Sequence, residues 1–316
     1  MTTKIGRYFS LIGMLLLGAC TMFHTPTPVP PTPLPATATL AIPTPVIPTP
    51  LPDAPGIGPA DVRNSLYQLG FSDQVRMVQL EDGQYQSDDL TGADYVSVAV
   101  TDFIVRGDVN RDGENEAIAI IAENYGGSGT FVFLVVYQFI NDEAVFLTSV
   151  FLDDRPLIND LAVEDGEIFV DLVIHSKDDP MCCPTQAITR RYLLNGVNLI
   201  LTSYSTETPA GEPRAITIEE PVNTAQVSGI VHLRGNITIA PSEKNLVYRI
   251  YDLGGVELSA GPVDVDAPEL GAPGTFEKAI DLGNILKDTT IRIEVQDINN
   301  ADRSLIAMDS VLLKVR

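Results

Sequence analysis

Apolar and polar residues alternate in short stretches along most of the chain, and turn-forming residues separate the stretches. Glu81-Asp82-Gly83, Asn141-Asp142 and Glu164-Asp165-Gly166 are such turns. Successive side chains of a strand point to opposite faces of a sheet, so this pattern predicts antiparallel strands joined by tight turns. In the first half of the chain the predicted strands are residues 75–80, 95–100, 117–121, 130–140, 144–151 and 167–175.

One segment near the start of this region has a different period. Val62, Leu66 and Leu69 recur at a spacing that places them on one face of a helix, and Asp61 lies near the start of the segment. This spacing predicts a short amphipathic helix over residues 59–69. Together with the strands it predicts an α+β domain built on an antiparallel sheet, at residues 57–205.

The last hundred residues have seven further strand-like stretches. They are residues 216–218, 231–235, 247–252, 255–258, 275–280, 291–295 and 310–315. Most of them alternate apolar and polar residues, as strands half-buried in a β-sandwich do. Residues 206–213, with two prolines and no apolar period, predict a linker before this second domain.

The spacing within residues 214–316 resembles a known domain type. The residues that carry the resemblance run from Glu220-Pro221 through Val227 to Gly235, and from Arg249-Ile250-Tyr251-Asp252 to Gly261. They are similar to the immunoglobulin-like domain first described in bacterial spore-germination proteins. The resemblance implies a β-sandwich without catalytic residues that serves as a binding or spacer module at the cell surface. The sequence as a whole therefore predicts a mainly β protein.

The first nineteen residues predict an export signal. Lys4 and Arg7 precede an apolar stretch, residues 8–17, that is too short to cross a bilayer as a helix. Leu17-Gly18-Ala19-Cys20 follows and resembles the lipobox of bacterial lipoproteins. This resemblance implies cleavage before Cys20, lipidation of its thiol, and a protein anchored to the cell membrane on the extracytoplasmic face.

Residues 20–56 are rich in Thr-Pro and Pro-x-Pro steps. Proline has no backbone N–H donor and fixes its own φ angle, so this segment predicts an extended polyproline II spacer, here called the stalk. At about 3.1 Å per residue the stalk reaches on the order of 100 Å when straight. That length is enough to display a globular part beyond the lipid headgroups.

The chain is strongly acidic. It has 42 Asp and Glu residues against 20 Lys and Arg, and a formal net charge of −22 at pH 7. A charge of this sign repels nucleic acid, which is therefore excluded as a partner. It suits divalent cations or simple solubility.

A cation site is predicted in residues 108–116. Oxygen-bearing side chains stand at positions one, three, five and nine of this segment, and a glycine stands at position six, where a calcium loop turns sharply. They are Asp108, Asn110, Asp112, Glu116 and Gly113. Position twelve, which supplies a carboxylate in an EF-hand, is Ala119, and the flanking stretches are strand-like. The EF-hand is therefore excluded.

A nine-residue loop of this kind between two strands resembles the calcium hairpin of integrin-type FG-GAP repeats. The resemblance implies a structural Ca²⁺ ion held by the side chains of Asp108, Asn110, Asp112 and Glu116 and by the backbone carbonyl of Glu114. Glu116 departs from the repeats, which usually have aspartate at position nine. An ordinary polar turn without a metal is the alternative.

Two adjacent cysteines form the second candidate site. Cys182 and Cys183 follow Met181, and His175 precedes them in the same loop. An exported compartment favours a disulfide between the two cysteines. The pattern leaves open a rigid loop tip, a redox switch, a soft-metal site completed by His175 and Met181, and free buried thiols.

These features together predict a surface-displayed, lipid-anchored binding, adhesion or scaffold protein of the bacterial cell envelope. We expect no enzymatic activity, because no paired-carboxylate or nucleophile motif is present. A wall polysaccharide or a surface protein is the expected ligand. The alternative function is that of an extracytoplasmic redox or soft-metal-binding lipoprotein that uses the loop from His175 to Cys183.

Overall fold

The computed structural model describes residues 58–71, 75–88, 94–141 and 143–316. The predicted leader, Cys20 and all of the stalk lie outside the described residues. Strands make up 61% of the structure, and the prediction of a mainly β protein with antiparallel sheets is confirmed. All the described residues belong to one compact unit, Pro52–Arg316. Within this described part of the chain, no helix has the length and apolar character that a membrane span requires.

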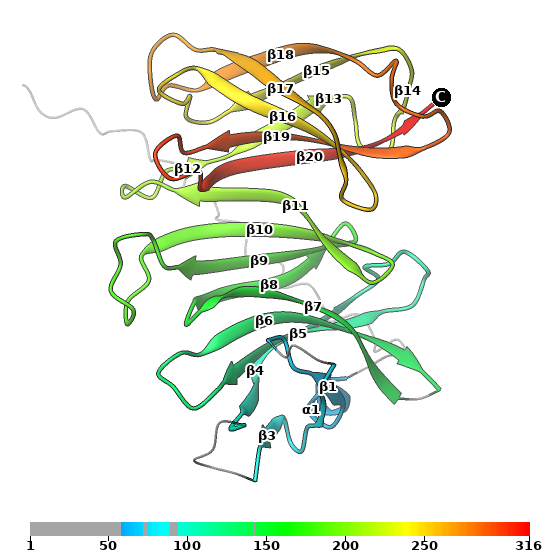
Figure 1. Ribbon diagram of the computed structural model, residues 1–316, viewed down its shortest axis with the longest axis vertical. Coiled ribbons are helices and arrows are strands. Elements are labelled where there is room, and N and C mark those ends of the chain that lie inside the picture. Colours follow the sequence, from blue (N-terminus) through cyan, green and yellow to red (C-terminus); the bar gives the residue numbers. More distant parts are fainter. Residues whose placement is uncertain (1–57, 72–74, 89–93, 142) are drawn as a thin grey trace, which may run out of the picture. The chain divides into compact units, whose positions relative to one another are not determined.

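The first sheet has five antiparallel strands in sequence order (Figure 1). They are β3 (Gln84–Gln86), β4 (Ser97–Gly107), β5 (Glu116–Asn124), β6 (Phe131–Ile140) and β7 (Glu143–Asp154). Before this sheet the chain forms the helix α1 (Pro59–Arg63) and a separate two-stranded pair, β1 (Leu66–Gln68) with β2 (Met77–Gln79). The predicted turn at Asp82-Gly83 is present, and both residues have positive φ angles, 49° and 82°.

Both faces of the five-stranded sheet are buried at its centre. Ala117, Ala119 and Ile121 of β5 join a core that includes Val62 of α1 and Tyr67 of β1. The residues between them in β5, Ile118 and Ile120, join a second core with strands β8 to β11. A strand covered on both sides needs apolar residues at every position, which explains the unbroken apolar run in β5.

The second sheet contains thirteen strands. Eleven of them follow the order β13-β15-β18-β17-β16-β19-β20-β11-β10-β9-β8, while β12 pairs with β11 and β14 pairs with β20. The first part of this sheet consists of β8 (Leu157–Glu164), β9 (Glu167–Ile174), β10 (Gln186–Asn195), β11 (Asn198–Glu207) and β12 (Pro213–Arg214). The second part consists of β13 (Ile216–Glu220), β14 (Gln226–Val227), β15 (Ile230–Ile237), β16 (Asn245–Asp252), β17 (Glu257–Asp266), β18 (Gly274–Asp281), β19 (Thr290–Ile298) and β20 (Leu305–Val315).

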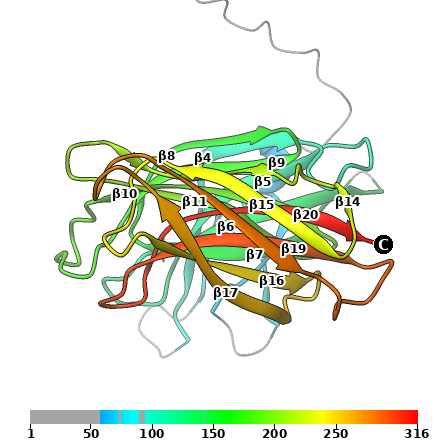
Figure 2. The ribbon, with the colours of Figure 1, turned by 90° about the horizontal axis from the view of Figure 1, so that it is seen from above.

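All seven strands predicted beyond residue 214 are present, each somewhat longer than predicted. β17 pairs with β16 along most of its length (Figure 2). At its end it pairs with β18, through Val265 and Asp266. The apolar core of this region contains residues of β15, β16, β18 and β19, among them Leu233, Ile250, Phe276 and Ile293. The sandwich itself and its immunoglobulin-like character stay predictions.

The two predicted domains are joined by strand pairing. β20 pairs with β11 through Ser203–Asp309 and Tyr204–Met308. The hydroxyl of Ser310 donates to the carbonyl of Thr202 at 2.8 Å, and Met308 packs in the core of the first domain. The predicted linker contains the end of β11 and a turn in which the amide of Thr208 donates to the carbonyl of Glu212.

The predicted helix at residues 59–69 is wrong beyond Arg63. The chain turns at Asn64 and continues as β1, in which Leu66 is 49% exposed and Tyr67 is fully buried. The helical spacing of Val62 and Leu66 was therefore misleading. Tyr67 decides the conformation of this segment, because its ring fills the core and its hydroxyl bonds to Glu123.

Candidate functional site

The candidate calcium loop connects β4 to β5, and the predicted strands on both sides of it are present. Arg111 and Gly113 have positive φ angles of 63° and 94°, and these reverse the chain over a few residues. The value at Gly113 is one that residues with a Cβ atom rarely adopt. Glycine at position six thus permits the sharp turn that the sequence pattern predicts.

Side-chain oxygens of the loop accept hydrogen bonds from its own backbone. The Asp108 carboxylate accepts from the amides of Asp112 and Gly113, at 3.1 and 3.0 Å. The Asn110 oxygen accepts from the amide of Asp112, and the Asp112 carboxylate accepts from the amide of Glu114, each at 2.8 Å. The loop is therefore folded around side chains at positions one, three and five.

Glu116 at position nine is the buried member of the set, with 3% of its surface exposed. Its carboxylate accepts from the amide of Val109 at 3.0 Å and from the side-chain nitrogen of Asn110 at 2.7 Å. Burial raises the pKa of Glu116, the nearby charges of Asp112 and Asp108 add to this, and the hydrogen bonds oppose it. The longer side chain at this position does reach the other loop residues.

The amide of Asn110 lies between two carboxylates, because its nitrogen donates to Asp112 at 2.8 Å as well as to Glu116. The N–H groups of this amide are partially positive, and they lie where a bound cation would neutralise the carboxylates of Asp112 and Glu116. In the described residues, no three His, Cys, Asp or Glu side chains are gathered as a metal would require. The donor set, all hard oxygen atoms around one loop, nevertheless fits calcium once the Asn110 amide turns its oxygen inward.

The loop also contacts the next sheet. The guanidinium of Arg111 donates to the carbonyl of Asp165, in the turn between β8 and β9, at 3.4 Å. Arg111 and Asp165 line a cavity of about 520 Å³ that extends to Asp309 and Ser310 of β20. The candidate calcium loop therefore lies beside the junction of the two predicted domains.

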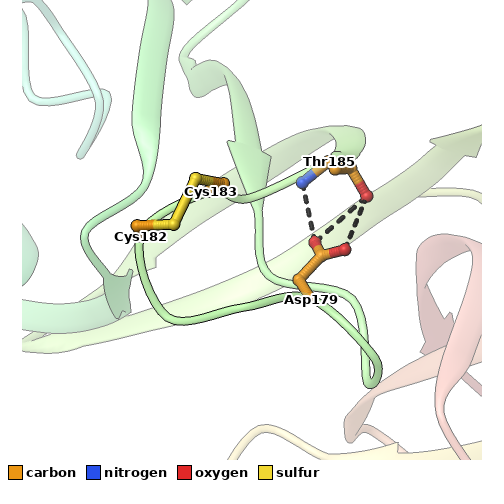
Figure 3. The surroundings of a disulfide bond; sticks show 4 residues. All are labelled: Asp179, Cys182, Cys183 and Thr185. Carbon is orange, nitrogen blue, oxygen red and sulfur yellow. Dashed lines mark hydrogen bonds between the residues drawn. A yellow bond between two sulfur atoms is a disulfide. The ribbon is translucent and has the colours of Figure 1, made fainter.

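The second candidate site is the loop between β9 and β10, where a disulfide joins Cys182 and Cys183 (Figure 3). Both cysteines are exposed, and Met181 beside them is 58% exposed. A bond between neighbouring residues encloses no further chain. It therefore stiffens the tip of the loop but ties no distant segments together.

Asp179 fixes the base of this loop. Its carboxylate accepts from the backbone amide of Thr185 at 2.8 Å and from the hydroxyl of the same residue (Figure 3). It also accepts from the backbone amide of Ser176 at 2.8 Å. These hydrogen bonds, with that from the amide of Ser176 first, lower the pKa of Asp179 to about 2. Asp179 was not predicted as a site residue, although Asp-Pro is a common turn signal.

His175 makes contacts at the start of the loop. Its backbone amide donates to Asp153 at 3.0 Å, and its Nδ1 lies 3.7 Å from the same carboxylate. Its Nε2 is buried and has no hydrogen-bond partner among the described residues. The two sulfur atoms are bonded to each other, and in that state they are not thiolate ligands for a soft metal.

Sequence reasoning missed one buried polar cluster. Glu123 of β5 is fully buried, and its carboxylate accepts from the hydroxyls of Tyr67 and Tyr125 and from the amide of Gly70, at 2.6, 2.5 and 2.8 Å. Burial and the adjacent carboxylate raise the pKa of Tyr67 and Tyr125. A glutamate inside an apolar strand was the available signal for this cluster, because a buried carboxylate needs donors.

Comparisons with known proteins give no relative from which a function could be transferred. No family model matches the chain, and no curated protein matches it either.

Proposed function

We propose that this protein is a lipid-anchored binding or scaffold protein on the extracytoplasmic face of a bacterial cell envelope. The observation that carries the proposal is Leu17-Gly18-Ala19-Cys20 after a basic and apolar leader, followed by the proline-rich stalk. The anchor retains the protein at the membrane, and the stalk holds the β-rich part away from it. No catalytic step is part of this function.

A structural calcium ion in residues 108–116 belongs to the proposal. Asp108, Asn110, Asp112 and Glu116 supply side-chain oxygens, and Glu114 supplies its backbone carbonyl. Support comes from the hydrogen bonds of Asn110 to Asp112 and Glu116, from those that Asp108 and Asp112 accept from the loop backbone, and from the hairpin that carries them. A divalent cation would offset the repulsion between three carboxylates held in one short loop.

Labelled fatty acid and cross-linking in intact envelopes test the proposal. The wild-type chain should incorporate the label at Cys20 and cross-link to a wall polymer or a surface protein. A Cys20→Ala chain should lose the label and leave the membrane fraction. Equal labelling of both chains refutes the anchor, and recovery of the wild-type protein from the cytoplasm refutes the location.

A redox role is the second candidate, and the exposure of the Cys182–Cys183 disulfide favours it. A dithiol reductant can reach these sulfur atoms without unfolding the protein. Complete resistance of the folded protein to millimolar dithiothreitol would exclude this role. Reduction within minutes would support it.

A further inference from the structure

Asp297 occupies a position in β19 where the pattern calls for an apolar residue. Ile291, Ile293 and Val295 precede it at every second position, and all three belong to the apolar core of the C-terminal strands. Side chains two residues apart in a strand share a face, so Asp297 continues this row towards the end of the strand. It is 5% exposed, and burial raises its pKa.

The carboxylate of Asp297 has no hydrogen-bond donor among the described residues. Its one charged neighbour is Arg214 of β12, which attracts it and opposes the rise in its pKa. No hydrogen bond or ion pair joins the two side chains in the described part of the chain, and the buried Nε–H of Arg214 has no acceptor there. Buried polar groups are nearly always paired, so the unpaired Nε–H of Arg214 close to a carboxylate without a donor needs an explanation.

A cavity of about 580 Å³ lies at these two residues. The turn between β19 and β20 lines it with Asn300, the loop after β15 with Pro241 and Ser242, and the loop after β17 with Leu270. Leu270 is 62% exposed. The size is in the range of small-ligand sites, and the lining combines apolar contacts with a few polar groups, as such sites do.

The charges at the cavity limit what it can bind. Arg214 repels a cation, while Asp297 and Glu243, which also lines the cavity, repel an anion. A neutral ligand that both donates and accepts hydrogen bonds therefore satisfies Asp297 and Arg214 best. Sugar hydroxyls have this property, since each is at once donor and acceptor. Adjacent hydroxyls of one ring can donate to Asp297 and accept from Arg214, while apolar side chains such as Leu270 contact its C–H face.

We propose that this cavity is a saccharide-binding site in which Asp297 and Arg214 hold neighbouring hydroxyls of a neutral sugar. The inference deepens the proposed function, on which it rests, because it names the ligand class and the residues of a binding module. The unpaired carboxylate is then retained for binding, at a cost in stability.

Calorimetric titration of the full chain with cellotetraose, mannotetraose and chitotetraose tests the site. We expect saturable binding of at least one of them. Asp297→Asn and Arg214→Gln should each weaken it about tenfold or more, because each removes hydrogen bonds to a charged group. Glu277→Gln, which neutralises an exposed carboxylate on β18 outside the cavity, should leave the affinity within about twofold.

Thermal unfolding provides a readout that does not need the ligand. Replacing both charged side chains by apolar groups, with a leucine continuing the row of Ile291, Ile293 and Val295, should stabilise the protein. The double variant Asp297→Leu, Arg214→Met should therefore raise the thermal midpoint by about 2–4 °C. A lower midpoint means that Asp297 and Arg214 form a water-bridged structural pair, and this overturns the proposal.

The other outcomes are equally decisive. Absence of saturable binding by all three sugars at millimolar concentration overturns the ligand class, and binding that Asp297→Asn leaves unchanged overturns the site. If the Asp297→Asn chain still cross-links to envelope components as the wild type does, the proposed function stands and only this inference fails.

Discussion

The hydroxyl of Tyr67 donates a hydrogen bond to the carboxylate of Glu123 at 2.6 Å, inside a core where both residues are fully buried. The bond joins β1, just after the first helix, to the middle strand of the five-stranded sheet. It explains why a glutamate is tolerated in the apolar strand β5, because the carboxylate accepts hydrogen bonds from its neighbours in place of water.

Loss of this hydroxyl should destabilise the protein. Tyr67→Phe keeps the ring but leaves a buried carboxylate with one donor fewer, and we expect the free energy of unfolding to fall by about 1–3 kcal/mol. Urea unfolding measures the change. Tyr85→Phe is the matched control, because the Tyr85 hydroxyl has no hydrogen bond among the described residues. Equal effects of the two substitutions would contradict the role given to Glu123.

Calcium should raise the thermal midpoint of the full chain. An ion bound only by the folded state adds about 2.7 kcal/mol when its concentration is a hundred times the dissociation constant. Asp108→Ala and Asp112→Ala should abolish the response, whereas Asp178→Asn, an exposed carboxylate in the disulfide loop, should preserve it. A wild-type midpoint that does not depend on calcium would leave residues 108–116 as a polar turn.

The carboxylate of Asp309 should make stability depend on pH. It accepts from the amides of Ile218 and Ser310, at 2.7 and 2.9 Å. Burial, and to a lesser extent the charge of Glu167, raise its pKa to about 6. The folded-state pKa exceeds the unfolded value, so the stabilising contribution is complete below about pH 4 and is lost as pH rises through 6.

Asp309→Asn removes this titration. Between pH 4 and pH 7 the difference in free energy of unfolding, variant minus wild type, should therefore rise by about 2–3 kcal/mol. Glu277→Gln serves as the control and should show no such trend. Parallel pH profiles of wild type and Asp309→Asn would show that the carboxylate titrates alike in the folded and unfolded chains.

Arg292 and Glu294 should behave as a coupled pair at the junction of the two predicted domains. Arg292 forms an ion pair with the buried Glu294 and donates to the carbonyl of Leu201 in β11 at 2.8 Å. Arg292→Met alone should cost about 3–5 kcal/mol, because it leaves Glu294 buried without its charge partner. The double variant Arg292→Met, Glu294→Leu should recover most of that loss in urea unfolding. Additive losses would show that the two side chains act independently.

Reduction of the Cys182–Cys183 disulfide should leave the thermal midpoint nearly unchanged, since the bond encloses no chain whose entropy it could restrict. Intact mass should show a gain of two hydrogen atoms, because the reductant supplies two electrons and two protons are taken up. Asp179→Asn should instead speed hydrogen exchange at the amides of Ser176 and Thr185, because both amides donate hydrogen bonds to the Asp179 carboxylate. A large fall in the midpoint on reduction would contradict the purely local role of the disulfide. Unaltered exchange in Asp179→Asn would contradict the role of Asp179 at the base of the loop.

The sequence predicted the local features well. Alternation and turn residues located the strands of the C-terminal region, and the spacing of Asp108, Asn110 and Asp112 located the loop between β4 and β5. Strand β10 was not predicted, although Ile188 and Leu194 are buried, because polar residues such as Arg190 and Arg191 interrupt its apolar positions. These arginines lie along the strand with partly buried stems, and Arg190 donates to the carbonyl of Leu152 at 3.0 Å. Strands β8 and β11 were not predicted either.

Contacts between distant segments could not be predicted. Asp297 and Arg214 belong to different strands, and neither lies in a motif that would signal a site. Tyr67 and Glu123 are 56 residues apart, and the helical spacing of Val62 and Leu66 concealed the buried tyrosine. Period and turn chemistry are local properties, whereas pairing across a core depends on the assembled fold.

The pairing of β20 with β11 also sets an order of events during synthesis. Thr202 and Ser310, which are hydrogen-bonded across this pair, are 108 residues apart, and the chain is made from its N-terminus. Until β20 has been made, the newly formed edge of β11 exposes unpaired backbone groups to any other extended chain. The protein therefore has a vulnerable interval before its sheet closes, in which a chaperone or fast export would protect it from aggregation.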